Sequence, residues 1–287
     1  VSSAAMRYTT LIDTQSLAGL LETDPPVLVD CRFNLADPDA GAQAYREAHI
    51  PGAVYAHLDH DLSAPRTGTN GRHPLPTPDA LRVTLGRLGI APGHQVVAYD
   101  QESGMFASRL WWLLRWMGHD AVAVLDGGMA AWSGEGRPDA HGDETVVTQH
   151  FTGAPMPGLT VSAAEVDRIR RDREMRLVDA RAPERFRGDV EPIDPVAGHI
   201  AGAVNHPFSG NLHDGRFLSP QALRERWAAT LDGHDGAQVV AYCGSGVTAC
   251  HNLLALEHAG IRGARLYAGS WSEWIADPTR AVARGDA

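Results

Sequence analysis

The chain contains the segment Val239-Val240-Ala241-Tyr242-Cys243-Gly244-Ser245-Gly246-Val247-Thr248-Ala249. Its first four residues are apolar or aromatic, which is typical of a buried strand. Residues 247–259 are rich in apolar side chains and are followed by Gly260, a pattern that predicts a helix with a glycine cap. Cys243 is therefore expected in a tight turn between a strand and a helix.

A cysteine in such a turn is placed to act as a nucleophile. Successive backbone N–H groups converge on one point there, and the helix N-terminus adds a partial positive charge. Both stabilise a thiolate without a metal ion or a base. Gly244 and Gly246 suit this arrangement because glycine adopts positive φ and leaves the amides uncovered. The alternative is a buried structural cysteine, which is common but does not need flanking glycines.

The composition allows a full hydrophobic core and two ordinary domains. The chain has 287 residues, 44% of them hydrophobic, and a formal net charge of −10. This charge argues against nucleic acid as a partner. No run of 18 apolar residues is present, and residues 1–10 lack the apolar core of a signal peptide. We therefore expect a soluble protein that does not bind a membrane.

The cysteine pattern is that of a reduced compartment. Cys31, Cys243 and Cys250 form no CxxC pair, and the 14 histidines show no metal-ligand spacing with a second cysteine. We expect a cytoplasmic protein with no metal site. On one helix, Cys243 and Cys250 would be about 10.5 Å apart along the axis, beyond the reach of a disulfide. Cys31 and Cys250 are interpreted as small core residues.

The two halves of the chain repeat four motifs in the same order. Residues 27–32 (VLVDCR) recur as residues 176–181 (RLVDAR), and residues 49–54 (HIPGAV) as residues 199–204 (HIAGAV). The run VVAY recurs at residues 96–99 and 239–242, and LDGG with Trp132 resembles LYAG with Trp274. The period is too long for a solenoid, so the sequence indicates a duplicated domain.

Within each half, short apolar strands alternate with helical patterns. This alternation predicts an α/β fold with a parallel sheet that helices cover on both faces. Helices are expected at residues 14–21, 162–171 and 107–117, the first two with Thr14 and Ser162 as N-caps. The predicted domains are residues 1–141 and 159–287. Residues 142–158 are expected to be a linker that wraps one domain, with Val146 and Val147 held against it.

The two halves differ where the chemistry is expected. Asp100 stands where the second half has Cys243, and its loop carries a further acidic residue, Glu102. We therefore expect the first half to be chemically silent. Three arginines follow residue 179, at the same sheet edge as Cys243: Arg181, Arg185 and Arg187. They favour capture of an anionic substrate. The alternative is that they form a salt-bridged surface. Residues 189–198, interrupted by prolines, predict a surface loop.

The tandem repeat, the HIPGAV-type motif and the single cysteine loop resemble the rhodanese-type sulfurtransferases over nearly the whole chain. The resemblance implies two tandem rhodanese-like domains. The catalytic one lies at residues 159–287, and the one at residues 1–141 lacks the cysteine. The loop is similar to that of 3-mercaptopyruvate sulfurtransferases, whereas thiosulfate-preferring members tend to carry basic residues at the positions of Gly244 and Ser245.

The resemblance also implies roles for named residues. Cys243 would take sulfur from a small-molecule donor, 3-mercaptopyruvate or thiosulfate, as a persulfide and pass it to a thiol, cyanide or protein acceptor. No cofactor is expected. Arg185 would bind the donor's carboxylate or sulfonate. His73 would take part in proton transfer; the alternative is that it is an ordinary loop histidine beside Pro74. The remaining implied site residues are Gly244, Gly246, Val247 and Thr248 of the anion-holding loop, with Ser245, His73 and Asp59 as a proton-relay group.

One departure from the family and two other functions remain open. The region after Arg185 where mercaptopyruvate enzymes carry a second arginine, residues 191–196, has none, which leaves the donor open. A cysteine phosphatase would need an arginine where this chain has Ala249. A non-enzymatic persulfide carrier or docking module would have the same cysteine loop.

Overall fold

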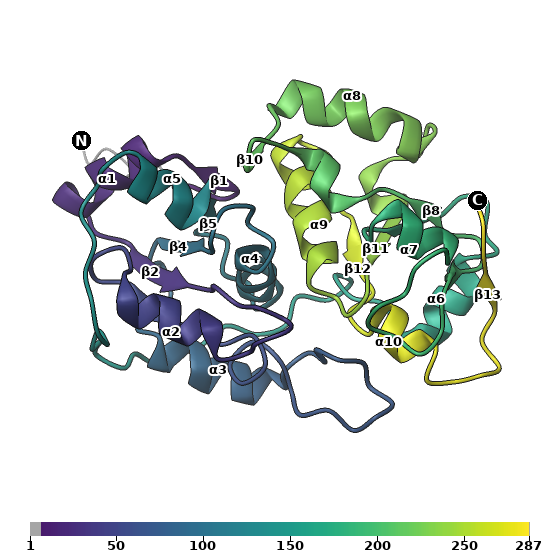
Figure 1. Ribbon diagram of the computed structural model, residues 1–287, viewed down its shortest axis with the longest axis horizontal. Coiled ribbons are helices and arrows are strands. Elements are labelled where there is room, and N and C mark those ends of the chain that lie inside the picture. Colours follow the sequence, from purple (N-terminus) through teal and green to yellow (C-terminus); the bar gives the residue numbers. More distant parts are fainter. Residues whose placement is uncertain (1–6, 287) are drawn as a thin grey trace. The chain divides into compact units, whose positions relative to one another are not determined.

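The computed structural model describes residues 7–286, so the expectation about residues 1–10 lies in part outside the described residues. The chain forms two compact units, with most of the first drawn in purple to teal and most of the second in green to yellow in Figure 1. Unit 1 comprises the described residues up to Leu62 and the segment Thr77–Met156. Unit 2 comprises Ser63–Pro76 and the described residues from Pro157 onward. The 14-residue segment Ser63–Pro76 thus packs with unit 2 although unit 1 surrounds it in the sequence.

Unit 1 contains a parallel five-stranded sheet with the strand order β1-β5-β4-β2-β3. The strands are β1 (Leu11–Ile12), β2 (Val27–Asp30), β3 (Val54–Tyr55), β4 (Val96–Tyr99) and β5 (Val122–Leu125). The helices are α1 (Thr14–Thr23), α2 (Ala40–Glu47), α3 (Pro78–Arg87), α4 (Ala107–Trp116) and α5 (Gly128–Gly134). Helices α1 and α5 lie together on one side of the sheet (Figure 1), where Leu17, Met129 and Trp132 join its core.

Unit 2 repeats this plan around a parallel sheet with the strand order β12-β11-β6-β8. Its strands are β6 (Arg176–Asp179), β7 (His199–Ile200), β8 (Val204–Asn205), β9 (Leu212–His213), β10 (Arg216–Phe217), β11 (Val239–Tyr242), β12 (Arg265–Leu266) and β13 (Val282–Ala283). Its helices are α6 (Ala163–Ile169), α7 (Pro183–Arg187), α8 (Pro220–Leu231), α9 (Thr248–His258) and α10 (Ser270–Trp274), with short 3-10 helices η1 (Phe208–Asn211) and η2 (Gly236–Gln238). Strands β9 and β10 pair with each other, and β13 pairs with β7, both antiparallel.

Continuous apolar runs explain the central strands. Every residue of β4 and of β11 is buried, because helices cover both faces of a parallel sheet and leave no solvent face for a polar side chain. In unit 2, helices α6, α7 and α10 pack on one face through Val166, Phe186 and Trp271. The predicted fold class, α/β with two repeats of a helix-covered parallel sheet, is confirmed.

The repeat extends to individual hydrogen bonds. The hydroxyl of Tyr99 in β4 accepts from the amide of Ile50 at 3.2 Å, and that of Tyr242 in β11 accepts from Ile200 at 3.1 Å. In both units the tyrosine that ends the central strand therefore fixes the HIPGAV-type turn.

The helix starts are partly as predicted. Ser162 caps α6 and forms a reciprocal capping box with Glu165, which confirms that prediction. The prediction of Thr14 as an N-cap is wrong, because Asp13 caps α1 by accepting from the amide of Ser16 at 2.7 Å. The hydroxyl of Thr14 instead donates to the carboxylate of Glu135, 121 residues further along.

The predicted linker follows unit 1 as far as Met156. The amide of Gln149 donates to the carbonyl of Gly86 and that of Met156 to the carbonyl of Trp116. Val147 is exposed, so the expectation that it would be held against a domain is wrong. The predicted domain boundaries themselves stay a prediction.

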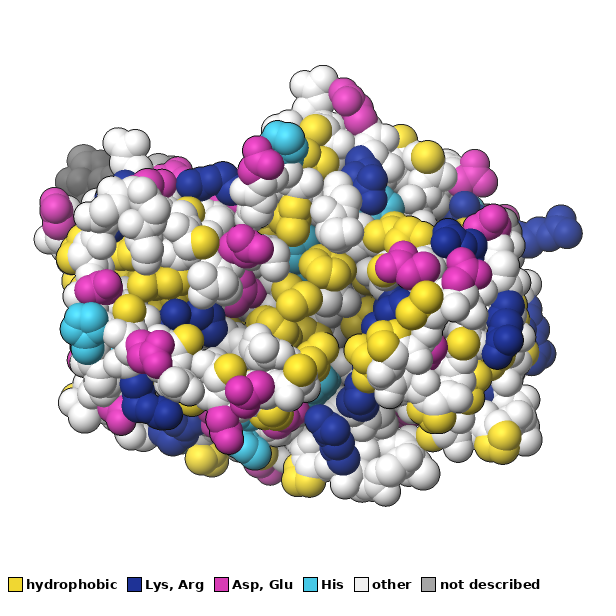
Figure 2. Space-filling model, viewed as in Figure 1, with side chains coloured by type: hydrophobic (Ala, Val, Ile, Leu, Met, Phe, Trp, Pro, Cys, Tyr) yellow, Lys and Arg dark blue, Asp and Glu magenta, His cyan; other side chains and the backbone are white. Residues whose placement is uncertain are grey.

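Acidic and basic side chains are interspersed on the face drawn in Figure 2. Among residues 7–286, no helix combines the length and the apolar character that crossing a bilayer requires.

Candidate active site

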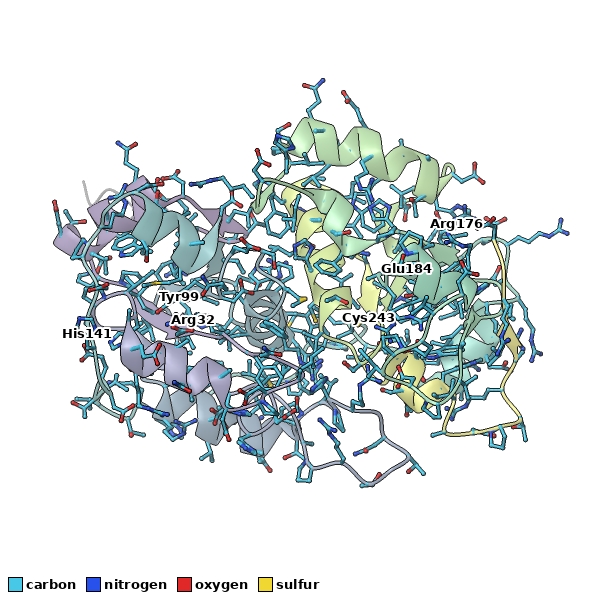
Figure 3. All side chains as sticks on the ribbon, in the orientation of Figure 1. Arg32, Tyr99, His141, Arg176, Glu184 and Cys243 are labelled. Atoms are coloured by element: carbon cyan, nitrogen blue, oxygen red, sulfur yellow. The ribbon has the colours of Figure 1, made fainter. Side chains whose placement is uncertain are left out.

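Cys243 lies directly after β11 and just before α9 (Figure 3). Its side chain is buried, and its Sγ accepts a hydrogen bond from the amide of Gly246 at 3.1 Å. Gly246 has φ +79°, and a Cβ there would lie 2.3 Å from the carbonyl oxygen of Ala268. Only glycine fits both the conformation and the space, so the amide that faces the sulfur depends on this residue.

The start of α10 fixes the backbone of the loop. The amide of Cys243 donates to Oγ of Ser270 at 3.1 Å, and the amide of Trp271 donates to the carbonyl of Cys243 at 3.0 Å. The amide of Ser272 donates to the carbonyl of Gly244 at 2.9 Å. These bonds hold the thiol-bearing turn in one geometry before any substrate arrives.

The segment Ser63–Pro76 brings a histidine to this loop. Nδ1 of His73 lies 2.7 Å from Oγ of Ser245, and both side chains are buried. The amide of Ala64 donates to the carbonyl of Pro74, which closes the segment on itself. The pair of a serine hydroxyl and a histidine can move a proton within two residues of the thiol.

Two guanidinium groups flank the loop at Gly244. A Cβ on Gly244 would lie 2.7 Å from Nη2 of Arg72 and 3.8 Å from both terminal nitrogens of Arg185. The amide of Arg72 donates to Oγ of Ser272 at 3.0 Å, which anchors this arginine beside the loop. Gly244 does not have positive φ, and its neighbours offer cations to an anionic ligand.

A search of the described residues for metal sites finds no group of three His, Cys, Asp or Glu side chains that could hold an ion. The chemistry available at Cys243 is that of a nucleophilic sulfur with a backbone donor, a serine–histidine pair and two cations.

The family model described as the rhodanese-like domain matches residues 13–135 and residues 162–277, once in each half of the chain. The chain belongs to the rhodanese-like family. This confirms the predicted resemblance.

Rhodanese-like proteins from several organisms are similar over nearly the full chain. A Pseudomonas aeruginosa protein, provisionally named a 3-mercaptopyruvate sulfurtransferase, is 52% identical over 279 residues, covering 96% of this chain and 98% of its own length. A Mycobacterium tuberculosis protein, provisionally named the thiosulfate sulfurtransferase SseB, is 41% identical over 96% of this chain and 98% of its own. The structure of SseA from Escherichia coli superposes with a TM-score of 0.81 at 28% identity, over 92% of this chain and 99% of SseA. These relatives confirm the predicted enzyme class, a sulfurtransferase.

The arginines expected at this rhodanese-like site have three different environments. Arg185 in α7 lies beside Gly244, as described above. Arg181 is buried and bonded to Asp179, as Arg32 is bonded to Asp30 in unit 1, so it belongs to the shared scaffold. The expectation that it captures an anion is replaced by the salt-bridge alternative.

Arg187 is bonded to Asp189 at 2.8 Å and is half-exposed, which also fits the salt-bridge alternative. Asp59 belongs to unit 1, where its amide donates to Nδ1 of His57 at 3.1 Å. The expected approach of Asp59 to His73 stays a prediction.

Val247 and Thr248 stand at the start of α9 as expected, with Val247 as the N-cap residue. Cys250 is buried in the first turn, and its thiol donates to the carbonyl of Gly246 at 3.3 Å, consistent with a core role.

The sequence reasoning missed Arg72. Its only signal in the sequence was its place next to His73, because nothing in the spacing connects residue 72 to residue 244. With Arg72 present, two cations flank the loop although residues 191–196 contain no arginine.

Proposed function

We propose that this protein transfers sulfur from an anionic donor to an acceptor through a persulfide on Cys243. The observation that carries the proposal is the Gly246 amide, which donates to Sγ of Cys243 in a fixed turn next to two guanidinium groups. An N–H donor of this kind stabilises the negative charge of a thiolate or a persulfide.

In the first step, the Cys243 thiolate attacks the sulfur of the donor. With 3-mercaptopyruvate, the carbon–sulfur bond breaks, its electron pair stays on carbon as an enolate, and the thiol proton ends on that carbon to give pyruvate. With thiosulfate, the sulfur–sulfur bond breaks and sulfite leaves with the electron pair. In the second step, cyanide or a thiolate attacks the outer sulfur and releases the Cys243 thiolate.

Ser245 and His73 suit the mercaptopyruvate reaction. Their hydroxyl–imidazole contact of 2.7 Å supports a relay that carries the donor's thiol proton toward the enolate carbon. Thiosulfate has no proton to move, so this pair would add little to its reaction.

Arg72 and Arg185 would bind the donor's anionic group. Guanidinium groups hold a carboxylate through charge-assisted hydrogen bonds, and both of these lie beside Gly244 of the Cys243 loop. We propose 3-mercaptopyruvate as the preferred donor, because Gly244 and Ser245 add no cation within the loop for the second charge of thiosulfate. The predicted absence of nucleic-acid and membrane partners and the cytoplasmic location stay predictions from composition.

The two other functions are less well supported. Ala249, where a cysteine phosphatase needs a phosphate-clamping arginine, is fully buried and carries no charge. A passive persulfide carrier would not need the His73–Ser245 pair. Steady turnover with a small acceptor excludes it.

The test is a comparison of steady-state rates with 3-mercaptopyruvate and with thiosulfate, using cyanide as the acceptor. We expect kcat/KM to be about tenfold higher with 3-mercaptopyruvate, equivalent to about 1.4 kcal/mol of transition-state binding. Turnover of a phosphate ester instead, or no turnover with either sulfur donor, would overturn the proposed function.

A further inference from the structure

Two buried carboxylates lie next to the two guanidinium groups at Gly244. They are Glu191 and Asp194, in the loop of residues 189–198, and each side chain is only 4% exposed. The sequence predicted a surface loop here. Val190 and Ile193 of this loop are exposed, as the prediction requires, but its two acidic side chains turn inward, where Arg185 and Arg72 neutralise them.

Glu191 is part of the scaffold. Its carboxylate accepts from Nη2 of Arg185 at 2.7 Å and from the amides of Ile193 and Asp194 at 3.1 Å each. It also contacts Nη1 of Arg181 at 3.3 Å. Burial opposes ionisation, but the hydrogen bonds from Arg185 and from the two amides prevail, so the pKa of Glu191 is lowered. Its charge therefore holds Arg185 and the loop in place.

Asp194 contacts the same cations from another side. Its Oδ1 is bonded to Nη1 of Arg72, and its Oδ2 lies 3.4 Å from Nη2 of Arg185. Unlike Glu191, it bridges both guanidinium groups that flank Gly244. Its carboxylate thus occupies part of the cationic surface that an incoming anion would use.

The charges of these four side chains balance. Arg72 and Arg185 contribute two positive charges, and ionised Glu191 and Asp194 contribute two negative ones. A donor's anionic group therefore enters a site without net charge, where each negative charge it brings is repelled by Asp194. Because the groups are largely buried, solvent screens this repulsion only partly. A dianion is penalised twice as much as a monoanion.

We propose that Asp194 is a specificity-determining residue that disfavours dianionic sulfur donors and so selects monoanionic ones. This inference rests on the proposed sulfur transfer, and it adds a repulsive element to the selection of the donor. Arg72 and Arg185 attract any anion, and Asp194 disfavours those that carry two negative charges.

The experiment measures kcat/KM with 3-mercaptopyruvate and with thiosulfate for the full-length wild type and three variants. Asp194→Asn keeps an oxygen that can accept from either arginine but removes the charge. Asp194→Glu keeps the charge. Asp189→Asn is the matched control, because Asp189 is in the same loop but contacts Arg187 at the surface.

We expect Asp194→Asn to raise the ratio of kcat/KM for thiosulfate to that for 3-mercaptopyruvate by about tenfold, the size of one removed unit repulsion at a partly buried site. The change should lie mainly in KM for thiosulfate and should shrink at high salt. Asp194→Glu and Asp189→Asn should keep the wild-type ratio. If Asp194→Asn does not fold, Asp194→Ser carries the same prediction.

An unchanged ratio in a folded and active Asp194→Asn variant overturns the inference, as does an equal loss with both donors, which would indicate a purely structural role. Inactivity of the wild type with both donors would instead overturn the proposed function. The two failures are therefore distinguishable.

Discussion

The loop that follows β4 in unit 1 and the loop that follows β11 in unit 2 hold different side chains, a carboxyl group and a thiol, on the same scaffold. In unit 1 the carboxylate of Asp100 accepts hydrogen bonds from the amides of Gly104, Phe106 and Ala107 at 2.8–3.1 Å. In unit 2 the amide of Gly246 faces the sulfur of Cys243. Backbone donors that a built-in carboxyl group already occupies are not available to a substrate, which supports the prediction that unit 1 is chemically silent.

The two loops also differ in the charged side chains that surround them. The loop of unit 1 borders a cavity of about 330 Å³. Arg32 lines this cavity but is bonded to Asp30, while Asp100 and Glu102 contribute carboxyl groups. The loop of unit 2 instead has Arg72 and Arg185 beside Gly244, as described above. Arg72 and Arg185 are themselves paired with Asp194 and Glu191, so the two surroundings differ in the guanidinium groups placed beside the loop and not in net charge.

The most severe test of this comparison moves the nucleophile. Cys243→Ser should lower the rate of sulfur transfer by about 10⁴-fold or more, because a hydroxyl cannot form a persulfide. Adding Asp100→Cys should not restore it, because Glu102 and the missing cations disfavour a thiolate and an anionic donor there. Rates of the single and double variants decide the matter. Activity in the double variant would show that unit 1 is one substitution from competence.

The second test compares acid sensitivity. His206 is buried against Trp227, with ring centroids 3.6 Å apart, whereas the corresponding position of unit 1 is Ala56. Burial, with a smaller contribution from the charge of Arg226, lowers the pKa of His206 to about 4. In the unfolded chain this histidine binds a proton near pH 6.5, whereas in the folded protein it stays neutral down to about pH 4. The contribution of neutral His206 to the free energy of unfolding is therefore fully present above pH 6.5 and is lost as the pH falls toward 4.

This group should lower the free energy of unfolding by about 3 kcal/mol across that window. Chemical denaturation at several pH values measures it. His206→Gln should flatten the decline, and His213→Gln, at an exposed position, should not. An equal decline in wild type and His206→Gln would contradict the assignment.

The third test separates the two donors. His73→Ala should lower kcat with 3-mercaptopyruvate by about 10²-fold, because the proton relay through Ser245 is lost. The rate with thiosulfate should change much less, since no proton moves in its cleavage. Equal losses with both donors would mean that His73 only supports the fold of the loop.

The smallest effect is expected for the arginine that the sequence did not reveal. Arg72→Ala should raise KM for 3-mercaptopyruvate about tenfold, the value of one lost charge-assisted hydrogen bond. Arg187→Ala removes the same charge from an arginine that is bonded to surface Asp189, and KM should stay unchanged. A KM that stays unchanged in Arg72→Ala as well would remove Arg72 from the donor site.

Much of this architecture was predictable because it depends on residues that are close together in the sequence. The apolar runs of β4 and β11, the cap at Ser162 and the Cys243 turn each depend on residues close together in the sequence. The repeat also separates scaffold residues from site residues. Arg181 has a counterpart in Arg32 of unit 1, and each is bonded to the aspartate two residues before it, so this pair belongs to the shared scaffold.

The errors concern contacts between residues far apart in sequence. The Thr14 hydroxyl donates to Glu135 and therefore does not cap α1. The inward turn of Asp194 depends on its ion pair with Arg72, 122 residues away. No periodicity or motif records such pairs. The Arg72–Asp194 pair follows from the path of Ser63–Pro76, which lies between parts of unit 1 in the sequence but packs with unit 2.

The most direct test of the central claim is the intact mass of the protein after exposure to 3-mercaptopyruvate without an acceptor. We predict a wild-type mass increased by one sulfur atom, the same increase in Cys31→Ala, no increase in Cys243→Ser, and loss of the extra mass when cyanide is added. An unshifted wild-type mass under conditions of turnover, or a sulfur adduct that persists in Cys243→Ser, would contradict transfer through a Cys243 persulfide.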